Sequence, residues 1–188
     1  MTAPTAASLA FRLAQIADAD VIARIQTDGW RDAYRGLMPD RLLDGPLLED
    51  HCLLWRRLLA SGSDPMPLLA LGGGAEVGFC AMGKSRSGLP YETEVFALYI
   101  DTAWHRVGVG RRLMRASAIR AREAGSGSLM LWTLARNARA RAFYQRLGGI
   151  AVGEEEHCFG GTWLTEVAYA WADIDRLITH ATRPEDTP

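Results

Sequence analysis

The segment from Glu94 to Ala124 constrains the fold more than any other part of the chain. It begins with a run of β-branched and aromatic residues, Val95–Ile100, which is typical of a strand. A short loop with two glycines, His105–Gly110, follows, and small and apolar residues then recur at helical spacing. We expect a helix whose buried face carries Gly110, Leu113, Ser117, Ala121 and Ala124 and whose exposed face carries Arg111, Arg112, Arg115 and Arg122.

A strand, a glycine-containing loop and a helix in this order can hold a phosphate group. Amides at a helix start lack intrahelical partners, the helix dipole adds partial positive charge, and glycines let a ligand approach the backbone. Arg106 and Arg111 would add formal charge there. No Gly-Lys-Ser/Thr follows, and Leu113 stands where a dinucleotide fingerprint has its third glycine. From the loop alone, a phosphate site and a structural turn are both open.

A second informative segment follows a candidate buried strand at Ser128–Thr133. Asn137 is a suitable N-cap and Gly148–Gly149 a suitable stop for a helix between them. An apolar stripe at helical spacing lies within that helix and is formed by Ala140, Phe143, Tyr144 and Leu147. The segment therefore predicts a second strand followed by a helix.

Together the two segments resemble the GNAT superfamily of acetyl-CoA-dependent N-acetyltransferases. The family pattern Gln/Arg-x-x-Gly-x-Gly/Ala corresponds to His105–Gly110, with histidine in place of Gln or Arg. The downstream pattern Asn…Ala-x-x-Phe-Tyr…Gly-Phe is matched by Asn137, Ala140, Phe143, Tyr144 and Gly148, with Gly149 where the family usually has Phe. The resemblance covers the chain from about Leu9 to Asp173.

The order of predicted elements is β, α, α, β, β, β, α, β, α, β, β, which indicates a mixed α/β fold with a mostly antiparallel sheet. The resemblance implies the same architecture, a central sheet flanked by helices. At 188 residues the chain is long enough for one sizeable core. We expect a single N-acetyltransferase domain at 8–181, a flexible start at 1–7 and a disordered tail at 182–188.

The resemblance implies direct attack of an amine on the thioester of acetyl-CoA. Backbone amides of the strand Leu98, Tyr99 and Ile100 would polarise the thioester carbonyl and pair with the pantetheine arm. The loop would hold the pyrophosphate. The cofactor-binding residues implied in this way are Leu98, Tyr99, Ile100, His105, Arg106, Val107, Gly108, Val109, Gly110, Arg111, Asn137 and Phe143.

By the same resemblance, Tyr144 is the group that protonates the leaving thiolate. A phenol has an unperturbed pKa of about 10, so it keeps its proton at neutral pH and can donate it. The alternative is that Tyr144 is one more residue of the apolar stripe.

Glu94 is the candidate base that removes a proton from the amine. Some family members carry a catalytic glutamate at this distance before the glycine motif. Glu92 shares its strand face by alternation, so two carboxylates could flank the acceptor and raise each other's pKa. Two alternatives are an acidic strand end that faces water and a water relay without a fixed base.

The segment Trp30–Pro39 resembles the region that forms one wall of the acceptor site in many bacterial family members. Trp30, Tyr34 and Glu92 are therefore candidate substrate-binding residues; the two aromatics could equally be core residues. A small-molecule amine is the expected acceptor. A protein N-terminus or lysine, and an acyl-CoA-binding sensor domain without turnover, are the alternatives.

Composition excludes several other classes of function. A net charge of −1 makes no electrostatic case for nucleic acid or an anionic membrane surface. Three scattered cysteines predict no disulfide framework. The pairs His51–Cys52 and His157–Cys158 have poor ligand spacing, so we expect no metal. The cytoplasm is the expected location, and the aromatics of the last predicted hairpin make a homodimer an expectation as well.

Overall fold

The computed structural model of the chain describes residues 9–62 and 67–182. The flexible start predicted at 1–7 lies outside these ranges, as does the tail predicted at 182–188 except for Thr182. Thr182, which the sequence assigned to the tail, is held in place. Its amide donates to Thr179 O at 3.0 Å and its hydroxyl donates to Ile178 O at 2.7 Å.

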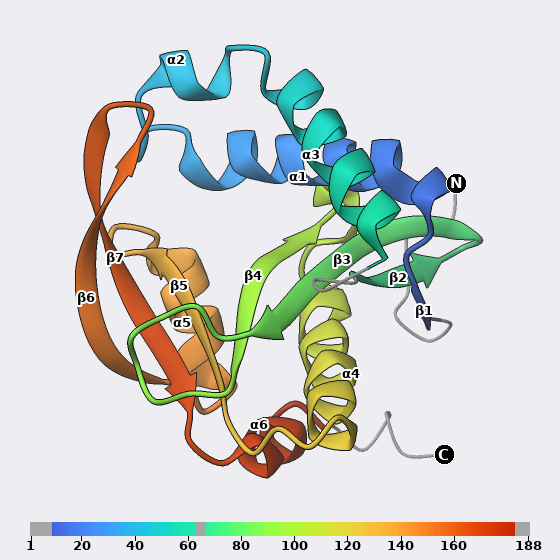
Figure 1. Ribbon diagram of the computed structural model, residues 1–188, viewed down its shortest axis with the longest axis vertical. Coiled ribbons are helices and arrows are strands. Elements are labelled where there is room, and N and C mark those ends of the chain that lie inside the picture. The colour runs from blue at the N-terminus through green and yellow to red at the C-terminus, as the bar shows by residue number, and fades with distance from the viewer. Residues whose placement is uncertain (1–8, 63–66, 183–188) are drawn as a thin grey trace. The chain divides into compact units, whose positions relative to one another are not determined.

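Within the described residues, seven strands are hydrogen-bonded in the order β1-β2-β3-β4-β5-β7-β6 (Figure 1). The strands are β1 (Ala10–Leu13), β2 (Leu68–Gly72), β3 (Ala75–Lys84), β4 (Thr93–Ile100), β5 (Leu129–Leu134), β6 (Ile150–Phe159) and β7 (Thr162–Trp171). The β4–β5 pair is parallel, whereas the pairs β1–β2, β2–β3, β5–β7 and β6–β7 are antiparallel. The predicted mixed α/β fold with a mostly antiparallel sheet is confirmed.

Helices connect these strands in the predicted order. They are α1 (Ala19–Tyr34), α2 (Asp40–Leu43), α3 (Leu47–Ser61), α4 (Val109–Glu123), α5 (Ala138–Arg146) and α6 (Ile174–His180), with short 3-10 turns at Ile16–Asp18 (η2) and Thr102–Trp104 (η3). Leu113, Ser117 and Ala121 are buried along α4 as predicted. Ala124 is exposed beyond the end of α4, because Gly125 adopts a φ of +93° and stops the helix.

The chain forms two compact units. Unit 1 comprises residues 1–82 and 97–113, and unit 2 comprises residues 83–96 and 114–188. The division passes through β3, β4 and α4, so each of these elements contributes residues to both units.

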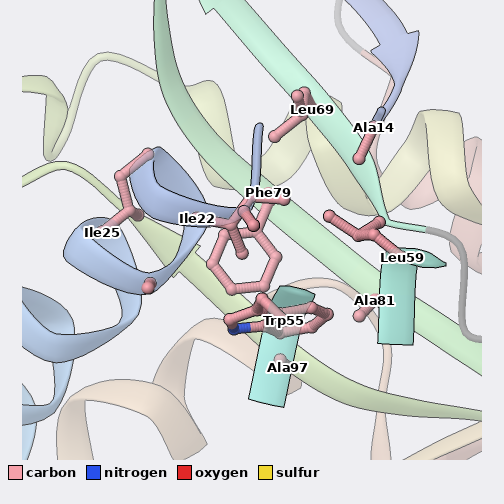
Figure 2. Packing of buried hydrophobic residues seen from close by; sticks show 11 residues of the cluster. Ala14, Ile22, Ile25, Trp55, Leu59, Leu69, Phe79, Ala81 and Ala97 are labelled. Atoms are coloured by element: carbon pink, nitrogen blue, oxygen red, sulfur yellow. The ribbon is translucent and has the colours of Figure 1, made fainter. Parts of the chain in front are cut away.

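The core of unit 1 packs α1 and α3 against β2 and β3 (Figure 2). Trp55 of α3 lies edge-on to Phe79 of β3, with ring centroids 5.2 Å apart. Its indole nitrogen donates to Gln26 Oε1 at 2.6 Å, so the buried polar atoms of both side chains are satisfied. Ile22 and Leu69 are fully buried in the same cluster. These contacts fix α1 on the sheet.

Asp18 immediately precedes α1, but its side chain does not cap that helix. Its carboxylate instead accepts from the Gln15 amide at 2.6 Å and from Arg12 Nη1 at 2.6 Å. The hydrogen bond from Arg12 lowers the pKa of Asp18 below its usual range. The carboxylate therefore ties β1 to the turn before α1.

Gly29 lies within α1 and makes a close contact with β4. A Cβ atom at this position would lie 2.6 Å from Tyr99 Cδ1 and 3.3 Å from Tyr99 Cγ. Gly29 therefore lets α1 approach the aromatic ring of β4.

Gly29→Ala is expected to destabilise the protein by about 1 kcal/mol. Alanine would gain about 1 kcal/mol of helix propensity, but overpacking against the Tyr99 ring costs about 1–3 kcal/mol. Urea denaturation checks the sign. Asp28→Ala, one position earlier on the exposed face, is the control and should change the unfolding free energy by less than about 0.5 kcal/mol. A stabilised Gly29→Ala variant would contradict the close packing.

Unit 2 is built on β5, β7 and β6. One face of these strands carries Leu129, Leu131, Tyr169 and Trp171 and packs against α5. The other face carries Met130, Ala168 and Ala170, which are covered by Leu89, Tyr91, Trp132 and Val152. The first residues of β4, Thr93–Val95, pair with Leu129–Leu131. Register therefore places Glu94 on the face opposite α5, beside Met130.

Candidate active site

The loop between β4 and α4 contains two residues with left-handed backbone conformation. Gly108 has a φ of +90°, and Arg106, with a φ of +65°, is the one non-glycine residue in the described part of the chain with a positive φ. Holding a non-glycine residue in this region costs about 1–3 kcal/mol, and such strain is concentrated at ligand sites. Gly108 directly precedes α4, and its carbonyl accepts from Arg112 N at 3.1 Å. The predicted glycine loop thus leads into a helix N-terminus.

Contacts with unit 1 fix the start of this loop. The Trp104 indole lies over Gly72, where a Cβ would come within 2.6 Å of Trp104 Cη2. His105 Nε2 donates to Ile100 O at 3.0 Å, because a carbonyl oxygen can only accept. The His105 ring, a predicted cofactor contact, therefore attaches the loop to the end of β4.

The predicted acceptor aromatics of unit 1 form one cluster. Trp30 meets Tyr34 edge-on, with centroids 5.5 Å apart, and meets His51 at the same distance. Tyr34 Oη lies 3.5 Å from Tyr99 Oη. The indole nitrogen of Trp30 is buried and has no hydrogen-bond partner among the described residues. An unpaired buried donor is costly unless a ligand satisfies it.

His51 supports this cluster from α3. It is buried, and its Nδ1 lies 2.8 Å from Thr27 Oγ1. Burial lowers the pKa of His51, so the ring is neutral at physiological pH. His51 therefore has a structural role in this cluster.

In unit 2, Asn137 caps α5 as predicted. Its Oδ1 accepts from Ala140 N at 3.0 Å, and the residue is 6% exposed. The helix ends before Gly148, which has a φ of +80°. The cap sets where α5 begins and hence where Phe143 and Tyr144 lie.

Tyr144 is 9% exposed and lies within an aromatic cluster. Its ring centroid is 5.3 Å from that of Phe143, 6.0 Å from that of Tyr169 and 6.4 Å from that of Trp171. Trp171 also explains the departure from the family pattern at Gly149. A Cβ at Gly149 would lie 2.8 Å from Trp171 Cζ2, so the indole occupies the space beside this glycine.

The two predicted carboxylates have different surroundings. Glu94 is 8% exposed, and its Oε2 accepts from the Arg86 amide at 2.9 Å. Burial rules out the alternative of an acidic strand end in water. Glu92 is exposed, precedes β4 and accepts from the Gly127 amide at 2.5 Å. Glu92 is therefore bound to the loop before β5.

The charge of Glu94 acts instead on Glu166 of β7, a residue that the sequence analysis missed. Burial raises the pKa of Glu166, and the negative charge of Glu94 raises it further, while His157 lowers it. A signal was available in the sequence, because Glu166 is the one charged residue in the segment Thr162–Trp171. Only the fold shows that its carboxyl is half-buried near a second carboxylate.

Strand register separates these groups by face. Tyr144 packs on the side of Tyr169 and Trp171, whereas Glu94 and Glu166 align with Met130 and Leu134 on the opposite side. Tyr144 and Glu94 therefore lie on opposite faces of the strands of unit 2.

In residues 9–62 and 67–182, no group of three or more His, Cys, Asp or Glu side chains is arranged to hold a metal ion. No helix in the same residues has the length and apolar character needed to cross a membrane.

Comparison with known proteins gives one family. Residues 27–149 match the model of the acetyltransferase (GNAT) family, a span that includes the loop, Asn137 and Tyr144. The uncharacterized N-acetyltransferase YuaI of Bacillus subtilis (strain 168) is 27% identical over 169 residues, which cover 89% of this chain and 95% of the relative.

Solved structures share the fold. The PaiA N-acetyltransferase of Thermoplasma acidophilum, in complex with coenzyme A, is similar with a TM-score of 0.66 at 16% identity, over 85% of this chain and 98% of the other. YncA of Salmonella typhimurium, a putative acetyltransferase with its cofactor acetyl-CoA, is similar with a TM-score of 0.64 at 21% identity, over 88% and 95%.

Proposed function

The chain belongs to the acetyltransferase (GNAT) family, and from this premise we propose that it transfers the acetyl group of acetyl-CoA to the primary amine of a small molecule. The observation that carries the proposal is the loop at 105–110, in which Arg106 and Gly108 are left-handed directly before the N-terminus of α4. Backbone in this conformation turns successive amides towards an anion.

Acetyl-CoA fits the residues of this loop. The pyrophosphate would be held by the amides of Gly108–Arg111 and by the charges of Arg106 and Arg111, with Val107 completing the loop. The β4–β5 ladder ends at Val95, so Leu98–Ile100 lie beyond the residues that pair with β5. This position supports their role in pairing with the pantetheine arm. The family resemblance adds Phe143 and Asn137 to this set.

When bound, acetyl-CoA supplies a thioester whose carbonyl carbon is attacked by a neutral amine. Tyr144 would donate its phenolic proton to the leaving thiolate as the C–S bond breaks and the N–C bond forms. Amides of Leu98–Ile100 would stabilise the charge on the carbonyl oxygen. The attacking nitrogen loses one N–H proton to solvent as the amide forms, and Tyr144 then regains a proton from solvent.

Glu94 is the carboxylate that we assign to the acceptor amine, as its base directly or through a water molecule. Its 8% exposure supports this role, since a buried carboxylate near an ammonium ion gains more than one in open water. Trp30 and Tyr34 would contact the body of the acceptor, and the unpaired indole nitrogen of Trp30 supplies a donor for it. Glu92 would take part only if its bond to Gly127 opens.

Three further parts of the proposal concern the whole molecule. Units 1 and 2 act as one catalytic domain, because the family match at 27–149 includes residues of both. The protein works in the cytoplasm, since Cys52, Cys80 and Cys158 are free thiols, as is usual in a reducing compartment. Trp163, 66% exposed on β7, is the contact that we assign to a homodimer.

Thiol release from acetyl-CoA tests the proposed activity. Polyamines, amino acids, aminoglycosides, arylamines and short peptides would be compared, each against a reaction without amine. We expect one class of small amine to raise thiol release at least tenfold, since a bound amine replaces water as the nucleophile. Release with peptides alone would replace the small-molecule acceptor by a protein. Acetyl-CoA binding with no release for any class would favour a sensor domain.

A further inference from the structure

The end of α5 is closed by a hydrogen-bonded turn that includes the backbone of Tyr144. The Gly149 amide donates to Tyr144 O at 3.0 Å, and the Gly148 amide donates to Gln145 O at 3.0 Å. Gly148 has a φ of +80°. These two bonds and the left-handed glycine form a Schellman motif, in which Tyr144 is the third residue before the C-cap Leu147 and Gly149 the second after it.

A Schellman motif is commonly stabilised by an apolar contact between the side chains at these two positions. Gly149 has no side chain with which to contact Tyr144. Strand β7 supplies a ring at this place, because a Cβ at Gly149 would lie 2.8 Å from Trp171 Cζ2 and 3.2 Å from Trp171 Cε2. The indole meets the Tyr144 ring edge-on, with centroids 6.4 Å apart. Trp171 therefore takes the part of the side chain that Gly149 lacks.

The same indole also binds the backbone at the end of α5. Trp171 Nε1 donates to Leu147 O at 2.8 Å, and the residue is 2% exposed. Its backbone is paired with Leu129 in the β5–β7 ladder. A close-packed ring on a paired strand has little freedom to move. Trp171 thus connects the end of α5 to the sheet through one hydrogen bond and one aromatic contact.

Tyr144 is sensitive to the order of this helix end. It lies in the last turn of α5, a helix of nine residues, and helix ends fray when they are not held. Proton transfer to a leaving thiolate requires the phenol within hydrogen-bond reach of the sulfur. A displacement of about 1 Å can lower the rate about 100-fold. Contacts that fix the end of α5 therefore bear directly on turnover.

We propose that Trp171 is a positioning residue that holds the Tyr144 phenol in the place from which it protonates the leaving thiolate. The inference rests on the proposed acetyl transfer and deepens it. Trp171 itself does not react, because its ring is buried and its nitrogen is bonded to Leu147 O. Its effect on turnover passes through Tyr144.

A double-mutant cycle measures this coupling. Trp171→Leu is expected to lower kcat about tenfold and to leave the Kd of acetyl-CoA within about twofold, since the phenol remains but is less well placed. Trp171→Leu added to Tyr144→Phe should lower kcat no further, because no phenolic proton is left to position. Residues that act independently multiply their losses. A further loss of about tenfold in the double variant would overturn the inference.

Ile174→Ala is the control for lost stability. Ile174 is 2% exposed at the start of α6, and its amide donates to Gly127 O at 2.9 Å. Its truncation should lower the melting temperature, as Trp171→Leu does, but should leave kcat unchanged at a temperature at which both variants are folded. An equal loss of kcat in Ile174→Ala would overturn the inference. If Trp171→Leu does not fold, Trp171→Phe, which removes the indole nitrogen but keeps a ring, should show a smaller loss that again disappears beside Tyr144→Phe.

Hydrogen exchange of the Gly149 amide gives a readout without substrate. This amide is bonded to Tyr144 O, so it exchanges slowly while the turn is closed. Trp171→Leu should raise its exchange rate about tenfold more than Ile174→Ala does. Equal exchange in the two variants would show that the turn closes without the indole and would overturn the inference, with the proposed function intact. A wild-type protein that releases no thiol with any amine would instead remove the proposed function.

Discussion

Gly108→Asp is expected to abolish acetyl-CoA binding while the fold is retained. Aspartate at φ +90° would place a carboxylate beside the amides that we assign to the pyrophosphate, 3.7 Å from Arg111 Nη2 at its Cβ. This carboxylate would repel the phosphates of acetyl-CoA and compete with them for Arg111. Loss of two or three charge-assisted hydrogen bonds, about 1.5–3 kcal/mol each, corresponds to an affinity loss of about 100-fold or more. Isothermal titration calorimetry measures the affinity for acetyl-CoA.

Gly62→Asp is the matched control for backbone strain. Gly62 has a φ of +63° at the end of α3, and a Cβ there meets nothing within 4 Å. Both variants add one carboxylate at a left-handed position, so both should lose similar stability in thermal denaturation. Only Gly108→Asp should lose acetyl-CoA. Unchanged affinity in a folded Gly108→Asp protein would remove the loop from the cofactor site.

Tyr144→Phe is expected to lower kcat about 100-fold with little change in the affinity for acetyl-CoA. The substitution removes only the phenolic oxygen, so the ring contacts with Phe143, Tyr169 and Trp171 are kept. Without the donated proton, the thiolate must leave as an anion or wait for solvent. Steady-state kinetics and a binding titration separate the two effects.

Tyr169→Phe is the control from the same cluster. Tyr169 is fully buried, and its hydroxyl accepts from Arg141 Nε at 3.2 Å and from Gln145 Nε2 at 3.3 Å. Its loss should cost about 1 kcal/mol of stability without a comparable loss of turnover. If Tyr144→Phe instead keeps full activity and loses only stability, Tyr144 is a packing residue.

Much of the fold was predictable because local patterns and tertiary contacts agree. The strand at 95–100, the capped helix after Asn137 and the stop at Gly148 each follow from short-range chemistry, and the structure confirms them. The family predicted from two motifs is confirmed by the match at 27–149. At Asp18, short-range chemistry favours an N-cap of α1, but the carboxylate is instead held by Arg12, which lies on another element.

The acidic side of the candidate site was less predictable. Alternation placed Glu92 and Glu94 on one strand face, but Glu92 lies outside β4 and is bound by the Gly127 amide. Glu166 was missed because its significance depends on burial and on Glu94, which is 72 positions away in the chain (166 minus 94). The spacing of residues along the chain does not show which distant positions the fold brings together.

By itself the sequence determined the glycine loop, the helix caps and the family, because backbone conformation at glycines and caps depends on residues within a few positions of each other. Only the tertiary structure decided that Tyr99 fits against Gly29, that Trp171 fills the space at Gly149, and that Glu166 meets the charge of Glu94. Packing and pKa depend on which side chains the strand register brings into proximity, and register is set by the whole sheet.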